Sequence, residues 1–504
     1  MSESPKESTS SQEGSSSPVS PEVQEPSAKG SLPITAMTEE QIQKDFKDLK
    51  NLQRSKGELS KKERKKLLKK LKKAVISQRE EIVRVISEDF GGRASYETLA
   101  AEVMLMARNI RHTLQHLDDW MEIQDKELSP LFWPASIQVR PQSLGVVGII
   151  SPWNYSVSLA ITPIAQAISA GNRVMLKPSE NTPKVASFLK RFLQDALGDD
   201  IVRVCVGDTE TAIAFSKQPF DHLFFTGSPD IGKKVMSAAA ENLTPVTLEL
   251  GGKTPALIHP SYSISKAAGK IAAGKFFNAG QTCISPDYVL CPKDKVSALV
   301  EGIQASLSKM YKTLEGNDDY TSIINERQRE RVRSLLQDAK DKGAKVTEFN
   351  PANETLSIKI APQIIENPSQ DMRILQEEIF GPLLPIVPYS TLEEAIDYIN
   401  DRPRPLALYY FDTKKKRINQ VLNQTHSGGV CINDTLLHVS QEELPFGGIG
   451  NSGMGMYHGK YGFDTFTHYK GVYKQSQFNW IVPRLSRPPY PGWVRAIVRF
   501  LTGW

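Results

Sequence analysis

A cysteine and a glutamate stand in sequence surroundings that would suit a nucleophile and a base. Cys283 lies in the stretch FFNAGQTCIS, where a glycine and small polar residues precede the thiol. Such small neighbours would let a substrate approach the sulfur and the backbone closely. A free cysteine is more often a small buried hydrophobic residue, so Cys283 alone is weak evidence for nucleophilic catalysis.

Glu249 lies between two leucines in LELGGKTP, at the end of an apolar run. Partial desolvation raises the pKa of a carboxyl group toward the range that suits a general base. The two glycines that follow leave room for a ligand. A second interpretation is structural, with Glu249 paired to Lys253 at the end of a strand.

Three more polar segments also follow apolar runs. Asn154, in SPWNYS, carries an amide that could stabilise an oxyanion, although a simple turn asparagine would give the same pattern. Lys177 and Glu180, in MLKPSE, could donate to and accept from ribose hydroxyls. Gly227 and Gly232, in FTGSPDIG, surround a predicted helix start suited to a pyrophosphate, but they do not form the GxGxxG fingerprint.

Alternating strands and helices must position these residues. Apolar runs of strand length alternate with helical stretches from residue 144 onward, and a second alternating block runs from about 250 to 450. This alternation predicts mostly parallel sheets with helices on both faces. Ligands bind at the carboxyl ends of such strands, where the polar segments lie. Nearer the N-terminus, Thr38 with Gln41 and Ser60 with Glu63 have the spacing of capping boxes.

The basic run KKERKKLLKKLKK follows Ser60, and its leucines recur at helical spacing. We interpret its basic side as the solvated face of a helix packed on the core, with contact to anionic lipid as the alternative. The first 36 residues are rich in Ser, Pro and Glu, which predicts a disordered tail.

The composition excludes several classes of protein. The 504 residues allow two or three domains, and a net charge of +5 is too small for this length to indicate nucleic acid. The four cysteines form no CxxC pair, so we expect neither a disulfide framework nor a metal site. The sequence shows no signal peptide pattern and no apolar span. We therefore expect an intracellular protein, cytoplasmic or on the cytoplasmic face of an organelle membrane.

Taken together and in order, the motifs resemble the aldehyde dehydrogenase superfamily from about residue 40 to 475. The motifs are SPWNYS, LKPSE, FTGS, LELGGKTP, GQTC, EEIFGP and LPFGGIGNSGMG. The stretches QTCISPDYVLC and GNSGMGMYHGKYGFDTFTHYK are similar to its class 3 branch, which includes fatty aldehyde dehydrogenases and coniferyl aldehyde dehydrogenase-like enzymes. The resemblance implies an α/β fold with a Rossmann-like NAD-binding domain, an α/β catalytic domain and a small β bridging element for oligomerisation.

The resemblance also places the domain boundaries. We predict a disordered tail at 1–36, an NAD-binding domain at 37–247 with bridging strands near 125–145, a catalytic domain at 248–450, a bridging segment at 451–476 and a C-terminal tail at 477–504.

By the same resemblance, Cys283 is the nucleophile, Glu249 activates the hydrolytic water, and Asn154 forms the oxyanion hole with the backbone N–H of Cys283. Ser156 stands where the family usually has proline, so the tunnel wall beside Asn154 is expected to differ. Further residues are assigned to the cofactor site and to the substrate tunnel. The cofactor residues are Ser151, Trp153, Lys177, Ser179, Glu180, Gly227, Ser228, Gly232, Leu250, Glu378 and Phe380, and the tunnel residues are Tyr155 and Phe446.

The predicted function is NAD-dependent oxidation of a hydrophobic aldehyde to its carboxylic acid, with fatty, apocarotenoid and aromatic aldehydes left open. A carboxylate at Glu180 would repel a 2′-phosphate, so NAD is preferred over NADP, which remains a secondary cofactor. One alternative is acyl transfer to coenzyme A, or ester hydrolysis, on the same cysteine. Another is a non-catalytic structural or membrane-tethering protein on this scaffold.

The C-terminal stretch FNWIVPRLSRPPYPGWVRAIVRFLTGW is compositionally separate. Arg495 and Arg499 share a helix face, with apolar residues over the rest, and the helix is too short to span a bilayer. The expected partners are thus an aldehyde, a second copy of the chain in a homodimer, and a membrane surface that the tail contacts. Packing of the tail on a partner subunit or over the tunnel is the alternative. No nucleic-acid partner is expected.

Overall fold

Capping boxes begin the first two helices of the computed structural model, which describes residues 36–478 and 486–503. Thr38 caps α1 (Glu39–Lys56) and Ser60 caps α2 (Lys61–Ser77), each with the reciprocal bond predicted from the spacing. Leu68, Leu71 and Val75 of α2 are buried, and α2 packs on α5 (Leu105–Trp120), α6 (Ser158–Ser169) and α7 (Pro183–Leu197). Most lysines of α2 are exposed, which fits a solvated face on a core-packed helix.

The predicted alternation after residue 144 forms a six-stranded sheet in the order β15-β7-β6-β3-β4-β5. Every neighbouring pair is parallel except β15 with β7. Its strands are β3 (Val146–Ile150), β4 (Arg173–Lys177), β5 (Val202–Val204), β6 (His222–Gly227), β7 (Val246–Leu250) and β15 (Gly453–Met454). All five residues of β3 and of β4 are buried, as in a sheet covered on both faces.

The second alternating block forms a seven-stranded sheet in the order β10-β11-β12-β9-β8-β13-β14, in which only β10 and β11 pair antiparallel. Its strands are β8 (Pro255–Ile258), β9 (Tyr288–Pro292), β10 (Lys345–Glu348), β11 (Gln363–Glu366), β12 (Leu383–Tyr389), β13 (Ala407–Phe411) and β14 (Gly429–Ile432). The predicted α/β fold is thereby confirmed.

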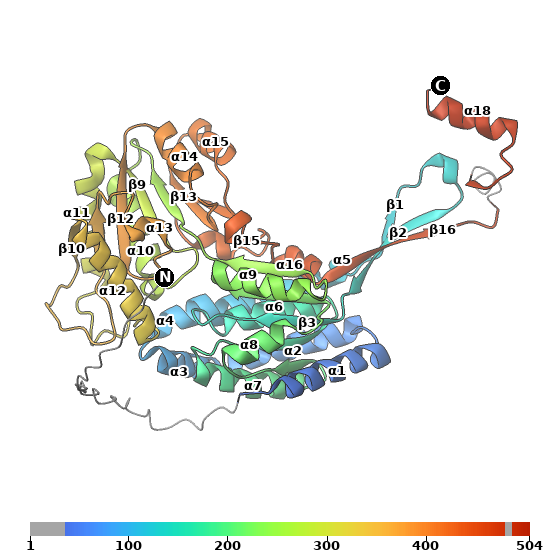
Figure 1. Ribbon diagram of the computed structural model, residues 1–504, viewed down its shortest axis with the longest axis horizontal. Coiled ribbons are helices and arrows are strands. Elements are labelled where there is room, and N and C mark those ends of the chain that lie inside the picture. Colours follow the sequence, from blue (N-terminus) through green and yellow to red (C-terminus); the bar gives the residue numbers. More distant parts are fainter. Residues whose placement is uncertain (1–35, 479–485, 504) are drawn as a thin grey trace, which may run out of the picture. The chain divides into compact units, whose positions relative to one another are not determined.

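A third, three-stranded sheet joins residues that are more than 300 positions apart in the sequence (Figure 1). The long strand β16 (Thr467–Lys474) pairs antiparallel with β2 (Ser136–Ser143), whose other neighbour is β1 (Gln124–Lys126). Within the described residues, β16 has no neighbour on its second edge.

The remaining helices cover the two large sheets. They are α3 (Arg79–Phe90), α4 (Ser95–Thr98), α8 (Thr209–Ser216), α9 (Pro229–Ala240), α10 (Ile264–Phe276), α11 (Val296–Met310), α12 (Glu326–Asp341), α13 (Arg373–Gln376), α14 (Leu392–Asn400), α15 (Lys415–Gln424) and α16 (Gly459–Thr465). The last described element is α18 (Gly492–Leu501). In the described part of the chain, no helix is long and apolar enough to cross a membrane. The disorder predicted for residues 1–36 falls almost wholly outside the described residues.

Candidate active site

A cavity of about 930 Å³ brings together residues at the ends of β6 and β7 with residues of α12, α13 and several loops. Cys283, Glu249 and Asn154 all line it, although they come from widely separated parts of the sequence. The other predicted site residues in its wall are Trp153, Gly227, Ser228, Leu250, Glu378, Phe380 and Phe446. The remaining predicted residues, which do not form part of this wall, are Ser151, Tyr155, Lys177, Ser179, Glu180 and Gly232.

The loop that carries Cys283 follows α10 and depends on unusual backbone conformations. Asn278, Ala279 and Gly280 all have positive φ, of 50°, 51° and 77°. A Cβ on Gly280 would lie 2.3 Å from the carbonyl oxygen of Gly381. The glycine before the cysteine is therefore needed for the turn and for packing on the segment that contains Gly381. That differs from the sequence interpretation, in which this glycine gave a substrate access to the sulfur.

The Cys283 thiol is half-buried, and its pKa is raised to about 12. Burial is the main cause, and the negative charges of Glu378 and Glu249 add to it. The thiol is thus largely protonated at neutral pH, and it must lose its proton before it can act as a nucleophile.

Glu249 is the penultimate residue of β7; it lines the cavity, and only 2% of the residue is exposed. Burial raises its pKa well above the ordinary value. Neither carboxylate oxygen has a hydrogen-bond partner among the described residues. The structural pairing with Lys253 is not formed, because Lys253 instead pairs with Asp287 and donates to the carbonyl of Ile374.

Asn154 is buried, and its side-chain amide donates to the carbonyl of Gln281, two residues before the nucleophile candidate. Its backbone carbonyl accepts from Arg93, which forms a fully buried ion pair with Glu102 at 2.8 Å. Glu102 also accepts from the backbone N–H of Ser158, at the start of α6. Sequence reasoning missed Arg93 and Glu102. Glu102 is signalled only as a charge in an apolar helical stretch, and Arg93 follows two glycines in a loop, with no such signal.

At the carboxyl ends of β4 and β6, the structure offers groups that suit a dinucleotide. Helix α9 begins after Ser228, at the predicted position, and no side chain of the described residues caps it, so its first N–H groups can meet a phosphate. Thr226, in the cavity wall, has a hydroxyl without a partner among the described residues. The Lys177 amine is buried, donates to the Pro178 carbonyl at 2.8 Å and lies 3.6 Å from Glu180.

Three more predicted cofactor residues do not line the cavity, but they contact residues close to it. The Ser151 backbone N–H donates to the Lys177 carbonyl, and the Ser179 hydroxyl accepts from the backbone of Asn181. Gly232 packs on Leu250, since a Cβ there would lie 2.7 Å from a Leu250 methyl carbon. This glycine brings α9 close to β7, behind the cavity wall.

Glu378 and Phe380 also line the cavity, and the Glu378 carboxylate lies beside Gly251, just after β7. Phe380 has a φ of 48°, a conformation that bulky residues rarely adopt, and its ring meets Trp153 edge-on at 5.2 Å. Glu378 is half-buried, and burial together with the charge of Asp287 raises its pKa to about 8.

The tunnel candidates Phe446 and Tyr155 occupy different positions. Phe446 lines the cavity and is sandwiched between the rings of His438 and His458. Tyr155 lies behind the nucleophile loop, where its hydroxyl is 2.6 Å from that of Thr282. It therefore contacts the loop that carries Cys283. Sequence reasoning missed both histidines, which are buried and have ring nitrogens without a hydrogen-bond partner in the described part of the chain.

Comparison with known proteins agrees with this geometry. Residues 11–472 match the sequence model of a protein family that is described as "Aldehyde dehydrogenase family". A "Probable coniferyl aldehyde dehydrogenase" of Pseudomonas aeruginosa is 47% identical over 431 residues, which are 86% of this chain and 90% of that protein. "Aldehyde dehydrogenase family 3 member A2" of Pongo abelii is 38% identical over 420 residues, 83% of this chain and 85% of that protein.

Two solved structures share the fold. The substrate-bound state of Staphylococcus aureus AldH is 37% identical, with a TM-score of 0.86, and the match covers 91% of this chain and 99% of that one. The NAD+ complex of an aldehyde dehydrogenase from Bacillus cereus is 27% identical, with a TM-score of 0.79, over 87% of this chain and 89% of that one. The chain belongs to the aldehyde dehydrogenase family, and the resemblance found in its motifs, including both branches, is confirmed.

Proposed function

We propose that this protein oxidises a hydrophobic aldehyde to its carboxylic acid, with NAD as the cofactor and Cys283 as the nucleophile. The observation that carries the proposal is the convergence of Cys283, Glu249 and Asn154 on one cavity, with the Glu249 carboxylate buried and unpaired among the described residues. An unpaired buried carboxyl is costly for the fold, so it is better explained by chemistry than by stability.

In this mechanism, the Cys283 thiol gives its proton to a solvent water, and the resulting thiolate adds to the aldehyde carbon, forming a tetrahedral thiohemiacetal. The Asn154 amide, held by Gln281, and the backbone N–H of Cys283 stabilise the oxyanion that develops. Loss of one such donor typically raises the barrier by about 2.7–4 kcal/mol. When bound, NAD supplies the hydride acceptor that turns the thiohemiacetal into a thioester. Glu249 then takes a proton from water, the hydroxide attacks the thioester, and the acid leaves as Cys283 is regenerated.

NAD would be held by the groups at the ends of β4 and β6. The Lys177 amine and the Glu180 carboxylate would meet the ribose hydroxyls, and the free N–H groups after Ser228 would meet the pyrophosphate. Glu378 and Phe380 would position the nicotinamide ribose and ring. The Glu180 carboxylate disfavours a 2′-phosphate, so NAD is the preferred cofactor and NADP the secondary one.

Support for a hydrophobic substrate comes from the aromatic side chains in the cavity wall. Trp153, Phe380, Phe446 and Tyr457 all line it. The relatives named for coniferyl aldehyde and the class 3 relative fit the same preference. Fatty and aromatic aldehydes both suit such a wall.

The experiment follows NADH formation with saturated aldehydes of increasing chain length and with aromatic aldehydes, for the wild type and Cys283→Ala. We expect the wild type to reduce NAD without coenzyme A and the variant to be inactive. NADH formation that depends on coenzyme A would favour acyl transfer instead, because a working Glu249 hydrolyses the thioester. Full activity of Cys283→Ala would overturn the mechanism.

We further propose that the chain forms a homodimer through the bridging sheet. The second edge of β16 presents backbone N–H and C=O groups that have no partner strand within the described residues. A second copy that added its own strand would satisfy them. Light scattering coupled to size exclusion tests this, since a monomer mass at micromolar concentration would contradict it.

A further inference from the structure

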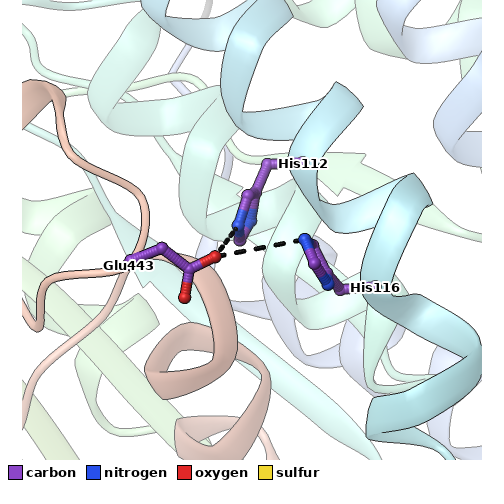
Figure 2. A group of neighbouring side chains, drawn as sticks. All are labelled: His112, His116 and Glu443. Carbon is purple, nitrogen blue, oxygen red and sulfur yellow. Dashed lines mark hydrogen bonds and ion pairs between the residues drawn. The ribbon is translucent and has the colours of Figure 1, made fainter.

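A cluster of two histidines and a glutamate lies outside the residues that line the cavity (Figure 2). His112 and His116 are four positions apart on α5, so both side chains project from the same helix face. Glu443 reaches them from the segment that follows the short helix η5 (Leu437–Ser440). In Figure 2, the carboxylate points toward both imidazole rings.

The three side chains present ligand atoms at close range. His112 Nε2 is 2.6 Å from a carboxylate oxygen of Glu443, and His116 Nε2 is 4.0 Å from the same oxygen. One ligand atom from each residue can be chosen so that all lie within 4.8 Å of one another. Ligands around a tetrahedral zinc ion lie roughly 3.3 Å apart, so small side-chain movements would complete the geometry. Glu443 can make such a movement because 80% of its side chain is exposed.

The ligand types select one class of cation. Two imidazoles and one carboxylate suit zinc and related transition metals, whereas calcium and magnesium prefer oxygen ligands. Water would fill the fourth position, and the half-exposed His116 leaves a path for the ion to enter. We propose that His112, His116 and Glu443 form a binding site for a zinc-like divalent cation, which joins α5 to the segment that carries Phe446.

A cation at this junction would affect the part of the cavity that is proposed to bind the aldehyde. The side-chain amide of Asn109, one turn of α5 before His112, donates a hydrogen bond to the Glu442 carboxylate at 2.6 Å. Phe446 of the cavity wall follows Glu443 by three residues. A cation at the cluster would add a second attachment and restrict the movement of this segment. This consequence rests on the proposed function, in which Phe446 lines the substrate tunnel.

Zinc binding can be measured without turnover in the full-length chain carrying Cys283→Ser, which removes the thiol that would compete for the metal. Calorimetric titration with zinc chloride is expected to give one site per chain. His116→Gln and Glu443→Gln should each weaken binding at least tenfold, because each removes a ligand. The matched controls are His426→Gln and Glu127→Gln, which replace exposed residues of the same types outside the cluster.

Equal zinc affinity in the cluster variants and the controls would overturn the site, as would absence of saturable binding. With Cys283 intact, saturating zinc should change the KM for the aldehyde severalfold while leaving that for NAD nearly constant, and Glu443→Gln should abolish the change. Binding that leaves both constants unaltered would retain the site but refute the link to the tunnel. Failure of NADH formation itself would count against the proposed function only, because binding is measured independently.

Discussion

At the scale of single residues, the buried and unpaired Glu249 separates the two halves of the proposed reaction. Glu249→Gln keeps the size of the side chain but removes its ability to accept a proton. We expect acylation of Cys283 to persist and thioester hydrolysis to slow by about 10²–10⁴-fold, the usual contribution of a general base. Stopped-flow measurement should then show a burst of NADH near one equivalent per site, followed by a slow steady state. A uniformly slow reaction without a burst would assign Glu249 to activation of the thiol.

The pH dependence of turnover follows from the raised pKa of Glu249. Burial disfavours its charged form, so the basic form becomes populated only as the pH rises through this raised pKa. Where hydrolysis limits the rate, kcat should climb as the pH rises through this raised pKa and level off above it. The same profile measured for Glu249→Gln should lack this limb. An identical limb in the variant would show that another group causes it.

Predictability from sequence differs among these residues for physical reasons. The sequence predicts Glu249 and Asn154 because each follows an apolar run, and Cys283 because small residues precede its thiol; the family motifs contain all three. The partners His112 and Glu443 were not, since 331 positions separate them and only the packing of α5 brings them together. The glycine at 280 was noticed, but its dependence on Gly381 needs the tertiary structure.

At the scale of elements, the buried pair Arg93–Glu102 links the region after α3 to the start of α6 and to Asn154. Removing one member leaves an uncompensated charge in the core. We expect Arg93→Met to lower the free energy of unfolding by about 3–5 kcal/mol, measured by urea denaturation. A loss below about 1 kcal/mol would mean that water reaches Glu102. Arg84→Met, on the exposed side of α3, is the control, and its surface ion pairs should contribute little.

The positions of helices and strands are more predictable from the sequence than the pairing of the strands. The strand and helix positions after residue 144 follow from the period of the apolar residues, and the capping boxes fix the starts of α1 and α2. The order of the strands in each sheet does not follow from such local patterns, because it depends on long-range pairing. The pairing of β16 with β2 and of β15 with β7 joins segments more than 200 positions apart, which no local pattern relates.

At the scale of the whole molecule, the C-terminal helix α18 bears on where in the cell the protein encounters its substrate. Phe500 and Leu501 are 84% and 62% exposed, and Arg495 and Arg499 lie on the same short helix. Exposed aromatic and aliphatic side chains beside arginines are typical of a helix that lies in a membrane interface. The membrane contact expected from the sequence therefore predicts that α18 binds anionic lipid surfaces.

Removal of residues 486–504 should abolish co-sedimentation with vesicles of phosphatidylcholine and phosphatidylserine, while NADH formation with a short soluble aldehyde stays within about twofold of wild type. The double variant Phe500→Ala/Leu501→Ala should lose most of the binding, because each buried CH₂ contributes about 0.8 kcal/mol. Arg495→Gln/Arg499→Gln should bind like wild type to vesicles of neutral lipid and more weakly to anionic ones, with the difference shrinking at high salt.

If the truncated chain sediments as the full chain does, α18 has another role. A change in mass by light scattering would then identify packing on a partner subunit, and a changed KM for the short aldehyde would identify a cover over the tunnel.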